Sequence, residues 1–107
     1  MPPRGQGEVA ALSPEKAQEY VRNTMNLLVI DVRSRKEFAD GHLVHAVNIP
    51  LYAFQREVKN IPSNVPILLH CQYGYRALQA YKLLRRLRPD VHDVRYAAGQ
   101  LACSFLR

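Results

Sequence analysis

Two continuous apolar runs constrain the fold of this 107-residue chain more than any other feature. Leu27 to Ile30 ends in Asp31, and Val65 to His70 ends directly before Cys71. A short run without polar alternation is typical of a strand that is buried on both faces, as in a parallel sheet. Such strands need helices to cover them and crossover connections to join them. The two runs therefore predict an α/β fold.

Helices and further short strands are predicted between and around these runs. Ser13-Pro14-Glu15 combines a capping residue, a proline suited to the first helical position and an acid that favours the positive end of the helix dipole, and it predicts a helix to about Asn23. Apolar residues at helical spacing predict the clearest helix from Arg76 to Arg88, which Pro89 ends. We also expect strands at Glu8 to Leu12, Ala46 to Ile49 and Asp93 to Tyr96, and helices at Ser34 to Ala39, Leu51 to Val58 and, after Ala98-Gly99, through Leu106.

The chain length suits one domain, because 107 residues leave no room for a second hydrophobic core. Residues 1–7 are rich in Pro, Gly and Gln, so we expect a flexible tail followed by a single domain over residues 8–107. No apolar run approaches the roughly 18 residues that a membrane helix needs, and the start lacks the hydrophobic middle of a secretion signal. We therefore expect a cytoplasmic protein without a membrane segment.

Cys71 is the candidate catalytic residue, because it follows a predicted buried strand and precedes a helix by a few residues. Ligands of α/β folds bind at the carboxyl ends of the strands. Backbone N–H groups and the helix dipole favour a thiolate at this position, and Arg76 adds a nearby cation. Gly74 allows positive φ angles, so the loop can surround the sulfur or a bound anion with N–H groups. The rim of this active-site loop would consist of Gln72, Tyr73 and Tyr75.

Five segments of the chain form a recognisable series of motifs. They are Asp31-Val32-Arg33, Glu37-Phe38, Gly41-His42, Ala46-Val47-Asn48-Ile49-Pro50 and Cys71 to Arg76. In order and spacing they resemble the motifs of the single-domain rhodaneses, which are small sulfurtransferases, and the likeness extends over nearly the whole chain. The loop pattern Cys-Gln-x-Gly-x-Arg is most similar to that of rhodanese domains linked to coenzyme A disulfide reductases. The resemblance implies a three-layer α/β fold with a central, mostly parallel five-stranded sheet flanked by helices.

The resemblance also implies thiosulfate sulfurtransferase activity through a persulfide on Cys71. The thiolate would take the outer sulfur of thiosulfate, or of a polysulfide or persulfide donor, and pass it to cyanide, a thiol or a partner protein. Arg76 would orient the small anionic donor. Neither a cofactor nor a metal is implied, and the active form would be a monomer or a homodimer. The family positions that look like supporting scaffold are matched by Asp31, Arg33, Glu37 and His42.

The chain departs from the family pattern at several positions. His45 stands where the family often has Gly, and Ala98-Gly99 stands where it often has Gly-Gly. The family commonly has a Trp in the last helix, whereas this chain has no Trp and places Cys103 near that position. We expect Cys103 to be a small buried hydrophobic residue. These departures concern local packing more than the chemistry of the loop.

Two other functions use the same fold or the same loop. Phosphatases of the cell-division-cycle type and the related arsenate reductases have five residues between Cys and Arg, whereas this chain has four. The shorter loop favours a sulfur atom over a tetrahedral phosphate ester. A binding or sulfur-relay module for a partner protein would form the same persulfide but turn over little thiosulfate.

The net charge of +6 would attract anions of any kind, including nucleic acid. Lys82, Arg85, Arg86 and Arg88 nevertheless lie at a predicted helix end, where the helix dipole already favours cations, and no nucleic-acid-binding motif accompanies them. The two cysteines and four scattered histidines lack the spacing of zinc ligands. We therefore expect neither a nucleic-acid partner nor a metal site.

Overall fold

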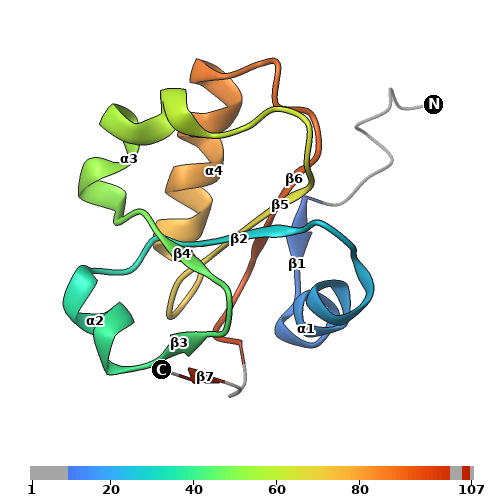
Figure 1. The fold of residues 1–107 in the computed structure, drawn as a ribbon, viewed down its shortest axis with the longest axis vertical. Helices are drawn as coiled ribbons and strands as arrows, with labels where there is room; N and C mark the ends of the chain where they lie inside the picture. Colours follow the sequence, from blue (N-terminus) through green and yellow to red (C-terminus); the bar gives the residue numbers. More distant parts are fainter. Residues whose placement is uncertain (1–9, 102–104, 107) are drawn as a thin grey trace.

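The computed structural model describes residues 10–101 and 105–106 of the chain, in which strands and helices alternate (Figure 1). Every residue of the two central strands is buried except Leu28, which is half-buried. The elements in chain order are β1 (Ala11–Leu12), α1 (Pro14–Asn23), β2 (Leu28–Asp31), α2 (Arg35–Asp40), β3 (His42–Leu43), β4 (Val47–Asn48), α3 (Leu51–Glu57), the 3₁₀ turn η2 (Val58–Asn60), β5 (Ile67–His70), α4 (Tyr75–Leu87), β6 (Val94–Ala97) and β7 (Phe105–Leu106).

Five of the strands form one sheet in the order β1-β6-β5-β2-β4, and every pairing in it is parallel. Asp31 at the end of β2 is in register with Asn48 on β4 and with His70 on β5. The carboxyl ends of three neighbouring strands therefore meet at one edge of the sheet. The loops that follow these strands, including the one that begins at Cys71, leave from that edge.

Helices cover both faces of the sheet and give three layers (Figure 1). Successive residues of a strand point to opposite faces, so the buried strands supply two separate cores. Ile30 and Leu69 pack with Phe54 of α3 and with α4 on one face. Val29 and Leu68 pack with α1 on the other face. The predicted α/β architecture with a central parallel five-stranded sheet is confirmed.

Local sequence signals account for most of the elements. The Ser13 hydroxyl accepts a hydrogen bond from the Lys16 N–H at 3.2 Å and caps α1 as expected. At α2, Ser34 and Glu37 form a capping box, in which each side chain bonds to the other residue's N–H. The predicted elements at both positions are confirmed to within a residue or two at their ends.

The expectation of a final helix through Leu106 is wrong at its end. Phe105–Leu106 is strand β7, which pairs antiparallel with β3 in a second, two-stranded sheet. A strand partner far away in the sequence leaves no local pattern, so helical periodicity could not reveal this pairing. The tail over residues 1–7, the first residues of the Glu8 to Leu12 strand and Cys103 lie outside the described residues.

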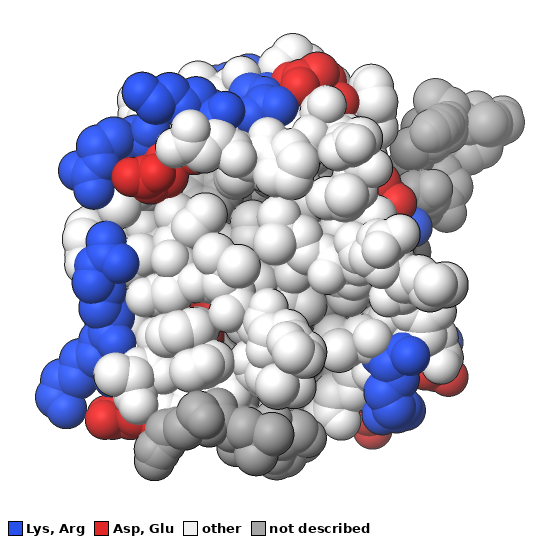
Figure 2. Space-filling view, in the orientation of Figure 1, with Lys and Arg blue, Asp and Glu red and all other residues white. Residues whose placement is uncertain are grey.

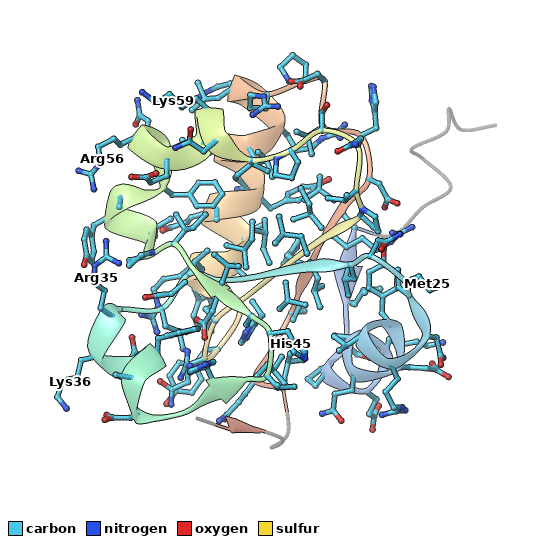
Figure 3. All side chains as sticks on the ribbon, in the orientation of Figure 1. Met25, Arg35, Lys36, His45, Arg56 and Lys59 are labelled. Atoms are coloured by element: carbon cyan, nitrogen blue, oxygen red, sulfur yellow. The ribbon has the colours of Figure 1, made fainter. Side chains whose placement is uncertain are left out.

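Lys and Arg side chains gather along one edge of the molecule, over α2 and α3 (Figure 2). Four of them are labelled in Figure 3, where they point outward from this edge, and they are Arg35, Lys36, Arg56 and Lys59. The centre of the same face is mostly uncharged. Within residues 10–101 and 105–106, no helix is long and apolar enough to cross a membrane.

Candidate active site

Cys71 lies directly after β5 and is 2% exposed. Its Sγ accepts two backbone hydrogen bonds, from the Gly74 N–H at 3.1 Å and from the Ala77 N–H at 3.2 Å. The second N–H belongs to the first turn of α4, where backbone N–H groups have no partner within the helix. The two N–H donors favour a negative charge on this sulfur, and so does the positive end of the helix dipole.

The backbone at Gly74 makes this arrangement possible. Gly74 caps α4 with φ = 95°, a conformation that costs other residues free energy. A Cβ atom at this position would lie 2.7 Å from the carbonyl carbon and oxygen of Ala98. The turn therefore needs glycine both for its backbone angle and for its close contact with the chain after β6.

A cavity of about 310 Å³ opens at Cys71, at the carboxyl edge of the sheet. Within the loop, Gln72 lines the cavity, whereas Tyr73 and Tyr75 are 62% and 75% exposed. The two tyrosines therefore lie on the surface, outside the described lining of the cavity, and their place at its rim stays a prediction. The lining residues are Arg33, Glu37, Asp40, Gly41, Cys71, Gln72 and Gln100.

Arg76 forms an ion pair with Glu37 through two hydrogen bonds, from Nη1 to Oε1 at 2.7 Å and from Nη2 to Oε2 at 3.1 Å. The hydrogen bonds from Arg76 lower the pKa of the Glu37 carboxyl to about 2, with a smaller contribution from the Ser34 N–H. Glu37 in turn raises the pKa of Arg76. Arg76 is not among the described residues that line the cavity. The pair joins the start of α4 to α2 beside the reactive loop.

Arg33 and Asp31 form a second ion pair, which is more deeply buried. Asp31 is 0% exposed, and its carboxylate accepts hydrogen bonds from the Arg33 N–H at 3.0 Å and from Nη2 at 2.8 Å. The same Nη2 donates to the Gly41 carbonyl oxygen at 2.7 Å. Arg33 therefore ties the end of β2 to the end of α2 and forms one wall of the cavity.

Two histidines near the site, His42 and His70, make contacts within the fold. His42 stacks on Phe38 with ring centroids 3.6 Å apart, and its Nδ1 lies 2.8 Å from the Phe38 carbonyl oxygen. His70 is completely buried, and its Nε2 lies 3.6 Å from Oδ2 of Asp31. Burial lowers the pKa of His70 to about 4, although Asp31 acts in the opposite direction. His70 is therefore neutral at pH 7.

Three contributions to the site lie outside the residues that the sequence singled out. The Ala77 N–H lies in the first turn of α4 and reaches the sulfur, and the rule on helix N-termini could have found it. Asp40 and Gln100 line the cavity through tertiary contacts that no local pattern signals. Among the described residues, no three His, Cys, Asp or Glu side chains are grouped so that they could hold a metal ion.

Two curated proteins show the range of sequence relatives. The uncharacterized protein YqhL of Bacillus subtilis is 38% identical over 69 residues, which cover 64% of this chain and 55% of YqhL. A sulfurtransferase of Allochromatium vinosum is 25% identical over 72 residues, which cover 67% of each protein. The matched region thus spans only about half of the Bacillus protein and two thirds of the other.

Solved structures of the same fold include single-domain and larger proteins. The human single-domain sulfurtransferase TSTD1 superposes with a TM-score of 0.73 at 24% identity, over 87% of this chain and 92% of that one. CoADR-RHD of Bacillus anthracis superposes with a TM-score of 0.65 at 27% identity, over 89% of this chain and 16% of that one. The family model of the rhodanese-like domain matches residues 13–99, and the chain therefore belongs to the rhodanese-like domain family.

Proposed function

We propose that this chain is a sulfurtransferase that carries a sulfane sulfur as a persulfide on Cys71. The observation that carries the proposal is the pair of N–H groups, from Gly74 and Ala77, that point at Sγ. The sulfurtransferases among its relatives support the same reaction class. The chemistry needs a reduced thiol, which agrees with the cytoplasmic location expected from the sequence.

The transfer consists of two nucleophilic displacements. The Cys71 thiolate attacks the outer sulfur of a donor such as thiosulfate, a polysulfide or an organic persulfide. A sulfur–sulfur bond to Cys71 forms while the donor's own bond to that sulfur breaks, and the bonding electrons leave with sulfite or a thiolate. An acceptor thiol or cyanide then attacks the outer sulfur and releases the Cys71 thiolate. The N–H groups of Gly74 and Ala77 stabilise the anionic sulfur in both steps.

No residue within the described part of the cavity needs to act as a base in this scheme. The scheme takes the thiolate as the attacking group, so proton removal is not part of either displacement. His70, although adjacent to Cys71, is buried beside Asp31. Arg76 acts through its ion pair with Glu37, which holds the start of α4 in the position from which the Ala77 N–H reaches the sulfur.

Replacement of the nucleophile tests the proposal. We expect Cys71→Ser to abolish transfer from thiosulfate or a polysulfide to cyanide, followed as thiocyanate formation. Cys103→Ser is the matched control, because it makes the same chemical change at the other cysteine. Equal turnover by the Cys71→Ser protein would overturn the proposal.

A sulfur-relay module is the second candidate function. The matched region covers only 16% of CoADR-RHD and 19% of a probable molybdopterin-synthase adenylyltransferase of Porphyra purpurea, so domains of this family also occur within longer proteins. A relay module would form the Cys71 persulfide at a normal rate but release it slowly to cyanide. Separate measurement of sulfur loading and sulfur release distinguishes the two functions.

A further inference from the structure

The guanidinium groups near Cys71 are each neutralised by a carboxylate. Arg33 Nη2 lies 2.8 Å from Oδ2 of the buried Asp31. Arg76 Nη1 lies 2.7 Å from Oε1 of Glu37. Each guanidinium group thus brings its own counter-charge, so neither pair presents a net positive charge to a molecule in the cavity.

Asp40 is the charged residue of the described cavity wall that lies outside these two ion pairs. The other charged lining residues are Arg33, which is paired with Asp31, and Glu37, which is paired with Arg76. Lys36 lies 3.4 Å from Asp40, but both side chains are largely exposed, and Lys36 points outward from α2 (Figure 3). The Lys36 ammonium is therefore well hydrated and only partly offsets the Asp40 carboxylate.

Three further exposed cations of the described residues lie away from this cavity. Arg35, Arg56 and Lys59 extend from the outer edge formed by α2, α3 and η2 (Figures 2 and 3). None of them lines the cavity at Cys71, and Arg35 lines a different one, beside β4. The net charge of +6 attracts anions to the molecule as a whole, whereas the two described arginines beside Cys71, Arg33 and Arg76, are each compensated by a carboxylate.

A dianionic donor meets two unfavourable charges in this cavity. The nucleophile is a thiolate, so thiosulfate must bring its two negative charges toward a third. Asp40 adds a like charge at the wall, the Glu37 charge is compensated by Arg76, and the loop N–H groups of Gly74 and Ala77 are already bonded to Sγ. Charges a few ångströms apart at a partly hydrated surface alter binding by roughly threefold to tenfold each.

We propose that this site takes its sulfur from an organic hydropersulfide whose remaining part is uncharged or carries an ammonium group, in preference to thiosulfate and other dianions, and that Asp40 is a specificity-determining residue. The inference rests on the proposed function. In the transfer, the Cys71 thiolate attacks the outer sulfur of R–S–SH. The Cys71 persulfide forms, the donor's sulfur–sulfur bond breaks, the proton stays on the transferred sulfur, and the electron pair leaves as R–S⁻.

Donors that differ only in the charge of R test the inference. The probes are 2-aminoethyl hydropersulfide and 2-sulfonatoethyl hydropersulfide, with thiosulfate as the dianion. The rate of sulfur loading on Cys71 is followed by intact mass. Each rate is divided by the rate at which the same donor transfers sulfur to the uncharged thiol 2-mercaptoethanol, which corrects for the donor's intrinsic reactivity. We expect the normalised rate of the ammonium donor to exceed that of the sulfonate donor at least threefold at low salt, and thiosulfate to be slower than both.

The variants separate local charge from net charge. Asp40→Asn should lower the ratio of the normalised loading rates of the ammonium and sulfonate donors by roughly threefold at low salt. The decrease should be smaller at high salt, because screening weakens the interaction. Glu19→Gln makes the same change in net charge on the exposed side of α1, away from the cavity, and should leave the ratio unchanged.

Each outcome has one meaning. Equal normalised rates for the ammonium and sulfonate donors, thiosulfate as the faster donor, or the same ratio in Asp40→Asn as in Glu19→Gln would overturn the inference while leaving the sulfurtransferase proposal intact. If no donor loads sulfur onto Cys71, the proposed function itself fails.

Discussion

Arg76 and Glu37, 39 positions apart in the sequence, form an ion pair that joins the first turn of α4 to α2. The start of α4 also supplies the Ala77 N–H that bonds to the Cys71 sulfur. The ion pair therefore holds the helix end that supplies one of the two described backbone hydrogen bonds to the Cys71 sulfur. We infer a positioning role for Arg76 beside the Cys71 loop.

A double-mutant cycle of Arg76→Gln and Glu37→Gln measures this pair. Both side chains are about one-third exposed, so solvent screens the interaction. We expect a coupling free energy of about 1 kcal/mol in urea unfolding, at the upper end for a partly exposed pair because two hydrogen bonds are formed. Additive single-variant effects would show that the pair contributes nothing.

The Glu37 carboxylate makes the free energy of unfolding depend on pH in the acidic range. The pKa of Glu37 is about 2 in the folded chain, below its ordinary value of 4.5. Its contribution to the free energy of unfolding is therefore present above pH 4.5 and is lost as the pH falls toward 2. The stability difference between the unmodified chain and Glu37→Gln should shrink over that interval. A difference that is constant with pH would contradict the lowered pKa.

Gly74→Ala should destabilise the fold and impair the site together. The positive φ costs an alanine about 1–2 kcal/mol, and the added Cβ overlaps the Ala98 carbonyl group, so we expect a loss of at least about 2 kcal/mol in the free energy of unfolding. Gly99→Ala is a suitable comparison, since among the described residues its Cβ would meet the side chain of Pro14, at 3.1 Å, and no backbone atom. A smaller loss for Gly74→Ala than for Gly99→Ala would count against this account of the turn.

His70 should remain neutral down to an acidic pH. Burial lowers its pKa to about 4 from an ordinary value of 6.5, so the unfolded chain takes up the proton first. The free energy of unfolding therefore falls as the pH drops from 6.5 to 4. Proton NMR of the imidazole ring, assigned by comparison with His70→Asn, should give a midpoint near pH 4. A midpoint near 6.5 would exclude the neutral buried ring.

Much of the fold was predictable because its signals are local. The apolar runs that become β2 and β5, and the Ser13 and Ser34 caps of α1 and α2, all lie within short segments of the chain. The β3–β7 pairing was not predictable, because two short strands far apart in the sequence meet only in the folded molecule. The mistaken final helix has the same cause.

The residues of the candidate site were likewise predictable where they are neighbours in the sequence and not where tertiary structure brings them together. Cys71, Gln72 and Gly74 are neighbours in one loop, so their proximity follows from the sequence. The role of Arg76 in orienting an anionic donor stays a prediction. Its pairing with Glu37 was not predictable, because this contact depends on how α2 packs beside α4. Asp40 also reaches the cavity only through tertiary structure, so the charge of the cavity could not be read from the loop.

The intact mass of the chain after brief treatment with a sulfane-sulfur donor tests the central claim most directly. The account predicts one added sulfur atom, located on Cys71 by peptide mapping, removed by a thiol reductant, absent in Cys71→Ser and retained in Cys103→Ser. An unchanged mass with thiosulfate, polysulfide and hydropersulfide donors alike, or an added sulfur that persists in Cys71→Ser, would contradict it.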